Sequence, residues 1–581
     1  MINEKIKEII KKAAGDLYKN MEIPSFNVEY PKQKENGDYA SNIALILTQK
    51  TGKKPMEIAN EIANKINMEE KNKELFGKVA VAEPGFINFE ISDKYLKDGV
   101  EDVFKKKDKF GSSDLGKDKT IVIDYSAPNI AKPMHVGHLR TTIIGQSLYN
   151  IYRFLGYKVI SDNHIGDWGT QFGKLIYAYK NWGNKKEIHK NPIEEMTKLY
   201  VRFHKEAESD KELEESARKE TKRLQNKDGE NLKIWKFLVR ESIKDFDKKY
   251  KTLGIKFDCR LGESFYNDML GSVVREFIEK KIAVKSEGAI IINLEKYNLP
   301  PFLIKKTDGA YLYTTTDLAT AKYRKEKFKP DKILYVVANE QALHFQQLFA
   351  SLELIGWCKN IELQHIKFGM VLGEDGKKFS TRKGDTILLD DLVKNAINMS
   401  RKVVEEKNPG LSAKRKKKIS RIVGIGAIKY NDLSQNRLTN ITFDWKKMLS
   451  FEGNSGPYLQ YVYARISSLE EKFSDKYKLD RFNIFDKPEL DLLNENAEKS
   501  IMRQLIKFPE AIENSANENS PHLVALYLYE LASLYNNFYN SIPILKSEKK
   551  LAKARVALSK SVAIVIKNGL GLLGIEVLEK M

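Results

Sequence analysis

The chain of 581 residues carries 99 basic and 79 acidic side chains, for a formal charge of +20 and a pI near 9.3, and 42% of its residues are hydrophobic. This length predicts about four folding units with true cores and excludes a small disulfide-stapled scaffold. The positive charge favours a polyanionic partner such as nucleic acid, although lysines beside glutamates can also simply solvate helix faces.

Cysteine usage and hydropathy exclude further classes. The two cysteines, Cys259 and Cys358, lie about a hundred residues apart, which offers neither a disulfide framework nor a CxxC zinc site. The longest apolar stretches, such as 523–529, fall far below the ~18 residues of a membrane span. The first helix is amphipathic rather than a signal peptide. We expect a cytoplasmic protein with no zinc and no membrane contact.

Residues 1–112 predict a small α+β domain. The chain begins with an amphipathic helix and continues through the strand-like FNVEY, a glycine turn, another helix and the strand-like VAVAEPGFINFEIS. The apolar face of the first helix consists of Ile2, Ile6, Ile9, Ile10, Ala13 and Leu17.

Residues 113–405 predict a catalytic domain built on a parallel nucleotide-binding sheet. The buried-type strand KTIVIDYSAPN, a helix from about His138 to Leu155 and the strand KVISDN form a βαβ unit. A charged helical stretch and the strands GAIIINL and FLIKK suggest an insertion at about 181–288 that splits the sheet. The sheet resumes through KILYVVANE and KFGMVLG, whose polar ends favour ligand binding.

Residues 406–581 predict an all-α helix bundle, because the sequence after EEKNPGLSAKRKKK is almost wholly helical in pattern. The predicted fold class is therefore multidomain α/β: a split Rossmann-type parallel sheet with an inserted helical and strand domain, an N-terminal α+β domain and this bundle.

The first chemical motif is SAPNIAKPMHVGHLR, which follows a strand and opens a helix. Backbone amides at a helix N-terminus and the imidazoles of His135 and His138 favour a phosphate site. Gly137 would let a flat adenine ring approach the backbone. Paired histidines can also simply cap a helix.

The second motif is the glycine-bounded basic loop GEDGKKFSTRKGDT after KFGMVLG. Such a loop can close over a triphosphate and stabilise charge that develops on the leaving pyrophosphate. Taken alone, it is better explained as a solvated basic turn.

Together, in this order and about 240 residues apart, the two motifs resemble the HIGH and KMSK signatures of class I aminoacyl-tRNA synthetases. Further segments resemble arginyl-tRNA synthetases in particular, from the N-terminal domain to the last residue. They are NHIGDWGTQFGKL, GESFYND, YLYTTTDLA, KYNDLSQNR, FEGNSGPYLQYVYARI and LLGIEVLEKM.

The resemblance implies the activity of an arginine–tRNA ligase. ATP and Mg²⁺ would be cosubstrates, with no dedicated protein metal site, and L-arginine would be activated to arginyl-adenylate. Arginine would then pass to the 2′-hydroxyl of the terminal adenosine of tRNA(Arg), and tRNA would have to be bound before activation. We expect a monomer.

One departure affects the charge at the ATP site, since Thr381 stands where KMSK has its second lysine. Family members with such a loop carry a lysine just upstream of HIGH, and Lys132 stands there; Arg382 and Lys383 are further candidates. The resemblance assigns catalysis to His135, His138, Lys132, Lys378, Ser380 and Arg382. It assigns ATP binding to His135, Gly137, His138, Gly166 and Lys378.

Arginine recognition requires carboxylates and directional acceptors around a planar guanidinium. Tyr313 and Asp317 are four residues apart at the start of a predicted helix, so both side chains could reach one ligand. In the family the matching pair and Glu263 line the guanidinium pocket, while Asn129 and Gln341 hold the α-amino end. Alternatively, Tyr313 is a core residue and Asp317 a helix N-cap.

Three regions are candidates for tRNA contact. GPYLQYVYAR places Tyr458 and Tyr461 beside Arg465, which suits base stacking plus a phosphate contact, although aromatic stripes are more often core. The family's anticodon helices favour the first interpretation. KRKKK at 414–418 could touch the RNA backbone or solvate a helix, and the resemblance makes Phe86 and Asn88 candidates for contact with the D-loop.

Two other classes remain open. A small-molecule nucleotidyltransferase sharing HxGH would need no RNA, but such enzymes are usually short. A catalytically inactive RNA-binding relative would be expected to lose the two histidines, and both are present.

Overall fold

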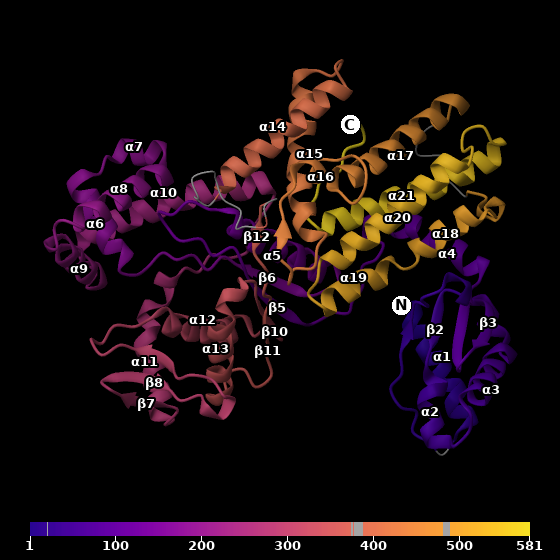
Figure 1. Cartoon of the computed structure of the whole chain (residues 1–581), viewed down its shortest axis with the longest axis horizontal. Coiled ribbons are helices and arrows are strands. Elements are labelled where there is room, and N and C mark those ends of the chain that lie inside the picture. The colour runs from indigo at the N-terminus through magenta and orange to yellow at the C-terminus, as the bar shows by residue number, and fades with distance from the viewer. Residues whose placement is uncertain (20, 374–375, 377–386, 480–487) are drawn as a thin grey trace.

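The computed structural model describes residues 1–19, 21–373, 376, 387–479 and 488–581. Figure 1 shows an N-terminal unit at one end of the molecule, a helical insertion at the other and a parallel sheet between them, with the C-terminal helices across the top of the view. The predicted fold class is confirmed: a parallel sheet carries separate α+β, inserted and all-α regions.

The N-terminal unit packs three helices on a four-stranded antiparallel sheet with the order β1-β2-β4-β3. The apolar faces of the helices supply the core, in which Ile6, Ile10, Ile58 and Phe89 are fully buried. The elements are α1 (Ile2–Leu17), β1 (Val28–Glu29), β2 (Tyr39–Ser41), α2 (Ile43–Thr51), α3 (Pro55–Met68), β3 (Phe76–Ala82), β4 (Phe86–Ile91) and the connecting α4 (Asp93–Lys106).

The central sheet has four parallel strands in the order β11-β10-β5-β6. Ile121, Val122 and Ile123 of β5 are fully buried, as expected for a strand covered on both faces. Asp124 and Asp162 pair in register at the carboxyl ends of β5 and β6. The elements are β5 (Thr120–Asp124), α5 (Val136–Phe154), β6 (Lys158–Asp162), α12 (Tyr313–Phe328), β10 (Lys332–Tyr335), α13 (Ala342–Leu354) and β11 (Glu362–His365).

The assignment of KFGMVLG to this sheet is wrong. Only β12 (Val371–Leu372) forms there, and it pairs with β13 (Ile441–Thr442) outside the sheet. The fourth strand is instead β11, with the sequence ELQH. Its residues are half-buried or exposed because it lies at the sheet edge, so it lacks the continuous apolar run by which a buried parallel strand is recognised.

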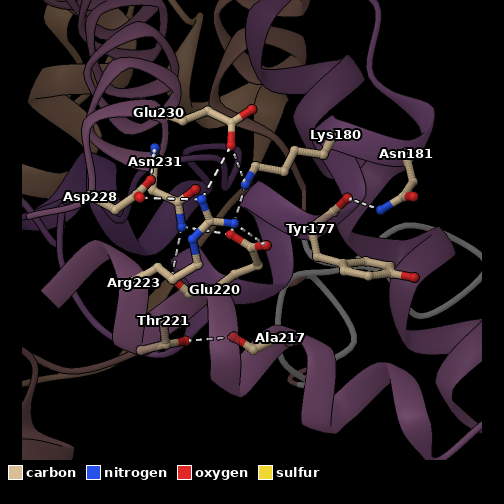
Figure 2. Close-up of polar contacts among 10 residues, drawn as sticks. All are labelled: Tyr177, Lys180, Asn181, Ala217, Glu220, Thr221, Arg223, Asp228, Glu230 and Asn231. Carbon is tan, nitrogen blue, oxygen red and sulfur yellow. Dashed lines mark hydrogen bonds and ion pairs between the residues drawn. The ribbon is translucent and has the colours of Figure 1, made fainter. Parts of the chain in front are cut away.

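A helical insertion follows the second strand of the sheet and consists of α6 (Gln171–Trp182), α7 (Lys185–Lys190), α8 (Pro192–Ala207), α9 (Glu212–Gln225) and α10 (Gly229–Leu253). Figure 2 shows the polar network that joins α6, α9 and α10. Lys180 Nζ lies 2.9 Å from Glu220 Oε2 and 3.0 Å from Glu230 Oε2. Asn231 Nδ2 donates to Glu220 Oε2 at 2.6 Å. This network therefore fixes α6 to α9 and α10. α6 begins directly after the β6–α6 loop, which contributes to the candidate site.

The strands GAIIINL and FLIKK form β8 (Ala289–Ile292) and β9 (Phe302–Lys305), which pair with β7 (Ala283–Ser286) in a separate antiparallel sheet. The helix α11 (Asn267–Glu279) contacts β7 and also α12. This small sheet thus lies inside the interruption between β6 and β10.

In the C-terminal region, β13 is the only strand among residues 387–479 and 488–581, and the other elements are helices. The α-helices are α14 (Leu389–Lys407), α15 (Ala413–Leu433), α16 (Trp445–Met448), α17 (Gly456–Tyr477), α18 (Asn496–Leu505), α19 (Phe508–Asn517), α20 (His522–Ser541) and α21 (Lys549–Leu572). α4 packs against α18 and α21, which joins the N-terminal unit to the bundle (Figure 1). Among the helices that the structure describes, none is both long and apolar enough to cross a bilayer.

Candidate active site

His135 and His138 cap the N-terminus of α5. His135 Nδ1 accepts a hydrogen bond from the N–H of Gly137 at 3.1 Å, and His138 Nδ1 accepts one from the N–H of His135 at 3.2 Å. The two rings lie 4.0 Å apart, centroid to centroid. A Cβ on Gly137 would lie 2.9 Å from His135 Cε1, so glycine leaves the space that this ring fills. The two histidines therefore do cap the helix, as one of the two interpretations predicts.

Capping also fixes the proton on each imidazole. A neutral ring whose Nδ1 accepts carries its hydrogen on Nε2, which then acts as a donor. Burial, followed by the charge of His135, lowers the pKa of His138 to about 3, so this ring is neutral near pH 7. Together with the positive end of the helix dipole, the pair can hold an anion such as phosphate.

The basic loop rejoins the described chain beside these histidines. The N–H of Val136 donates to the carbonyl of Ile387 at 3.2 Å, and the N–H of Leu389 donates to the carbonyl of Met134 at 2.9 Å. The segment after the loop is thus paired with the start of α5. The loop residues expected to act in catalysis or ATP binding, Lys378, Ser380 and Arg382, lie outside the described residues, as does Thr381.

Lys132 is exposed on the β5–α5 loop, three residues before His135. It follows Ala131, whose φ of 62° is in the left-handed region. The hydroxyl of Thr197 on α8 donates to the carbonyl of Ala131 at 3.4 Å, so the insertion contacts the backbone next to Lys132.

Asn129 and Gly166 contact each other, although Asn129 is predicted to bind arginine and Gly166 to bind ATP. The N–H of Ile130 donates to the carbonyl of Gly166, and the N–H of Gly166 donates to the carbonyl of Pro128, both at 3.1 Å. A Cβ on Gly166 would lie 2.0 Å from Asn129 Oδ1. Gly166 is therefore required for this close approach whether or not it contacts ATP.

Glu263 opens the short turn Glu263–Tyr266, and its carboxylate is largely buried. Its own N–H donates to the carbonyl of Ile165 at 3.1 Å, and its carboxylate accepts a hydrogen bond from the backbone of Trp168. Burial raises the pKa of Glu263 to about 7; Asp317 and Asp167 also raise it, and His164 lowers it. The negative charges of Asp317 and Asp167 near Glu263 favour a cationic ligand there.

Asp317 and Tyr313 begin α12, and neither alternative role is observed. Tyr313 is 60% exposed and so is not core, and the N-cap of α12 is Leu312 rather than Asp317. Asp317 Oδ2 instead lies 2.7 Å from Nε2 of His344 on α13, whose ring is 5.1 Å from that of Tyr313. Gln341 is exposed and is the N-cap residue of α13, the helix that carries His344.

Several residues around the candidate site have no counterpart among the sequence predictions, above all Arg324. This guanidinium is fully buried on α12, and its Nη2 lies 2.7 Å from Asp124 Oδ2 and 2.8 Å from Asp162 Oδ2. Two buried-type strands that each end in aspartate were the available signal, because a buried carboxylate needs a cationic partner. His344, His164 and Asp167 gave no comparable signal.

The two bundle tyrosines differ in exposure. Tyr458 is 8% exposed, and its hydroxyl accepts a hydrogen bond from Asn536 Nδ2 at 2.6 Å. Tyr461 is 39% exposed. The guanidinium of Arg465 lies 4.8 Å from the ring centroid of Tyr461 and 5.0 Å from that of Tyr539. An exposed aromatic and cationic surface therefore exists at Tyr461 and Arg465, whereas Tyr458 is buried.

The other candidate RNA contacts lie on different units. Asn88 is buried in β4, where it pairs with Ala40 and Ala80, and Phe86 is half-buried at the start of the same strand. The KRKKK segment forms the first turns of α15 and is mostly exposed. In the described part of the chain, no group of three or more His, Cys, Asp or Glu side chains could hold a metal ion.

Comparisons with known proteins agree with this arrangement. Residues 99–445 match the catalytic domain of the class I (R) tRNA synthetases, residues 2–91 the arginyl-tRNA synthetase N-terminal domain, and residues 459–581 the DALR anticodon-binding domain. Over 581 residues the chain is 44% identical to an arginine–tRNA ligase of Fusobacterium nucleatum, covering 100% of this chain and 99% of that protein. It is 42% identical to one of Halothermothrix orenii, with the same coverage.

Solved structures show the same similarity. An arginyl-tRNA synthetase from Plasmodium falciparum superposes with a TM-score of 0.83 at 27% identity, covering 100% of this chain and 99% of that one. The fold is also shared with the Thermus thermophilus arginyl-tRNA synthetase, at a TM-score of 0.81, 22% identity and 100% of both chains. With a catalytic-domain match over more than half its length and curated relatives of this identity along all of it, the chain belongs to the arginyl-tRNA synthetase family of class I aminoacyl-tRNA synthetases.

Proposed function

We propose that this protein is an arginine–tRNA ligase that activates L-arginine with ATP and transfers it to tRNA(Arg) at the edge of the parallel sheet. The observation that carries the proposal is the contact between Asn129 and Gly166. It joins the loop that presents His135 and His138 to the loop that holds Glu263. This contact supports a phosphate site and an arginine site that would lie next to each other.

The guanidinium of arginine would bind between Glu263 and Asp317, with Tyr313 beside it. A planar, always charged guanidinium suits two carboxylates on separate elements. Because His344 already contacts one oxygen of Asp317, the other oxygen would face the ligand. Asn129 and Gln341 would hold the α-amino end. Family membership and the polarity of these positions support this assignment.

ATP would lie over the N-terminus of α5. The Nε2–H groups of His135 and His138 would donate to phosphate oxygens, and Gly137 would leave room for the nucleotide. Lys132 would supply positive charge that the neutral His138 does not, and Lys378, Ser380 and Arg382 would act from the loop. Mg²⁺ carried by the ATP phosphates would neutralise part of their charge.

Activation needs no protein nucleophile. The α-carboxylate of arginine attacks the α-phosphorus, pyrophosphate leaves and arginyl-adenylate forms. The 2′-hydroxyl of the terminal adenosine then attacks the activated carbonyl and AMP leaves. Catalysis consists of positioning and of stabilising charge on the leaving pyrophosphate. We also propose that tRNA must be bound before activation.

The proposed division of labour assigns residues 1–112 to the outer corner of tRNA, with Phe86 as the candidate contact, and residues 406–581 to the anticodon, through Tyr461 and Arg465. The expectation that Asn88 and Tyr458 touch RNA is not retained, because both side chains are buried. Residues 113–405, with the insertion at about 181–288, would form the catalytic domain. The family matches of the three regions support this division. Cytoplasmic location and a monomeric state stay predictions.

ATP–pyrophosphate exchange with each of the twenty amino acids, with and without tRNA(Arg), tests the proposal. We expect exchange with arginine and with none of the other nineteen amino acids, and we expect it only when tRNA is present. Exchange with another amino acid would contradict the substrate. Exchange with arginine in the absence of tRNA would contradict the ordered requirement but not the ligase activity.

A further inference from the structure

A second buried carboxylate, that of Asp167, lies close enough to Glu263 to raise its pKa, and both of its oxygens are occupied by Ser264. Asp167, on the loop between β6 and α6, is only 6% exposed. Its Oδ1 accepts a hydrogen bond from the N–H of Ser264 at 2.8 Å, and its Oδ2 accepts one from the hydroxyl of Ser264 at 2.7 Å. Both oxygens of Asp167 thus hold the residue that follows Glu263 in the chain.

The residue before Glu263 is fitted to the same carboxylate. A Cβ on Gly262 would lie 2.6 Å from the carboxyl carbon and from Oδ1 of Asp167. Only glycine leaves room for the acid at this distance. Glu263 is therefore flanked by a glycine and a serine that both fit Asp167.

Further contacts fix the loop that carries Asp167. The indole N–H of Trp235 on α10 donates to the carbonyl of Asp167 at 2.8 Å, and the rings of Trp168 and Trp235 meet edge to face at 5.6 Å. α10 is held to α6 and α9 by the network of Figure 2. The clamp on Ser264 is thus anchored in the helical insertion.

We infer that Asp167 is a positioning residue, which holds the Gly262–Ser264 turn through Ser264 and so aims the carboxylate of Glu263 at the substrate guanidinium. The inference rests on the proposed function, since it assumes that Glu263 binds arginine. Asp167 touches no substrate. It fixes the backbone on which a long, flexible side chain is mounted, and this lowers the entropy lost when Glu263 orders around the ligand.

The first test replaces the clamp and measures arginine and ATP separately. In Asp167→Ala, the KM for arginine should rise about tenfold or more, while kcat and the KM for ATP change little, because binding remote from the reacting atoms is lost equally from ground and transition states. An unchanged KM for arginine, or an equal rise in both KM values, would overturn the inference.

A conservative variant separates the clamp from the charge. Asp167→Asn keeps the shape, and Ser264 can still donate its N–H to the amide oxygen and accept from the amide nitrogen. The KM for arginine at pH 8 should therefore stay near the wild-type value. The titratable groups that act on Glu263 are His164, Asp317 and Asp167. Because the Asp167 charge is removed, the acid limb of kcat/KM for arginine should move to lower pH. A limb that stays in place, or moves up, would count against the inference.

Ser264→Ala tests the contact from the other side and does not depend on whether Asp167→Ala folds well. It should raise the KM for arginine by a smaller factor, and Asp167→Ala/Ser264→Ala should be no worse than Asp167→Ala, since both act through one contact. Independent, multiplying effects would overturn the inference. Asp258 provides a matched control, because its Oδ2 accepts hydrogen bonds from the N–H and hydroxyl of Ser161, each at 2.9 Å, on another element. Asp258→Ala should leave the KM ratio of arginine to ATP unchanged.

Glu263→Gln, measured in the same series, tests the proposed binding of arginine by Glu263 separately from the positioning role of Asp167. If it leaves the KM for arginine unchanged, the guanidinium pocket itself is wrong. If Glu263→Gln raises that KM and Asp167→Ala does not, the pocket stands and the positioning role of Asp167 is refuted.

Discussion

At the scale of single residues, the site separates hydrogen bonding from charge. His135 and His138 direct Nε2 donors from a helix N-terminus, but the lowered pKa of His138 leaves that ring uncharged in the working pH range. His138 would therefore add no net positive charge at the proposed phosphate site, and lysine and arginine, on the β5–α5 loop or on the basic loop that precedes Leu388, would supply it.

The pKa of Glu263 gives a pH dependence for arginine. Burial raises this pKa to about 7, so the free carboxyl is largely protonated below that pH and loses its charge-assisted bond to the guanidinium. The arginine guanidinium keeps its proton throughout. Therefore kcat/KM for arginine should fall as pH drops through 7, by up to roughly 10- to 150-fold at the limit. Steady-state kinetics between about pH 5.5 and 8.5 check this.

The control for this prediction is Glu263→Gln, which cannot titrate at that position and should show a flattened acid limb. Arginine binding near pH 7 should also release protons, because the bound cation favours the charged carboxylate. Calorimetry in buffers of different ionisation enthalpy measures that release. Proton uptake on binding would contradict the assignment.

At the scale of elements, α12 carries both the pocket and its attachment to the sheet. Its first turns present Tyr313 and Asp317, and Arg324, later on the same helix, joins the carboxyl ends of β5 and β6 through Asp124 and Asp162. The helix proposed to bind the substrate is therefore fixed to the strands whose loops would complete the site. Sequence spacing alone predicts that Tyr313 lies near Asp317. It does not predict that Arg324 contacts the carboxyl ends of β5 and β6.

Arg324→Met should destabilise the protein by about 3 to 5 kcal/mol, because it leaves two buried carboxylates without a cation. Equilibrium denaturation at pH 7 provides the measurement. Arg421→Met is a suitable control, since Arg421 makes an ion pair with the 59% exposed Glu576 and should change stability by under about 1 kcal/mol. Equal effects of the two substitutions would contradict the anchoring role.

On α17, the two tyrosines should respond differently to substitution. Tyr461→Ala removes an exposed ring beside Arg465 and should weaken tRNA binding by about 1 to 3 kcal/mol with little loss of stability. Tyr458→Ala removes a buried ring and should lower the melting temperature instead. Filter binding paired with thermal melts distinguishes them. A destabilised Tyr461→Ala with normal tRNA affinity would show that Tyr461 is structural.

At the scale of the whole molecule, the N-terminal unit is joined to the bundle by polar contacts as well as by helix packing. The hydroxyl of Tyr39 donates to Glu510 at 3.2 Å in a buried contact, and Arg503 reaches Asp38 at 3.1 Å and Glu90 at 3.2 Å. α4 lies beside α18 at this junction (Figure 1). The first and last regions of the chain are thus fixed to each other at this junction.

The net charge of +20 makes tRNA affinity sensitive to salt. If two or more phosphates are neutralised, the Kd for tRNA should rise by at least about tenfold between about 50 and 200 mM salt, because counterion release weakens. The KM for arginine should change far less, since the two proposed carboxylate partners of arginine, Glu263 and Asp317, are half-buried and salt screens them less. Filter binding and kinetics at matched salt concentrations compare the two. A salt-independent Kd would show that phosphate contacts contribute little.

The sequence by itself determined the fold class and the main chemical motifs. Apolar runs such as IVID and helical periodicity report which residues must leave water, and these patterns are local. The position of HVGH after a strand likewise predicted a helix N-terminus with two histidines, which the structure contains. What the sequence lacked was any local trace of β11, since an edge strand need not be apolar.

Only the tertiary structure decided which distant residues meet. The contact of Asp317 with His344, the clamp of Asp167 on Ser264 and the burial of Tyr458 depend on how elements far apart in the chain pack. These contacts set orientation and pKa because burial and neighbouring charge act through space rather than along the chain. Residue type and spacing therefore predicted what the site is made of, and packing decided which carboxylates are held, which are left for a ligand and which aromatic ring is exposed.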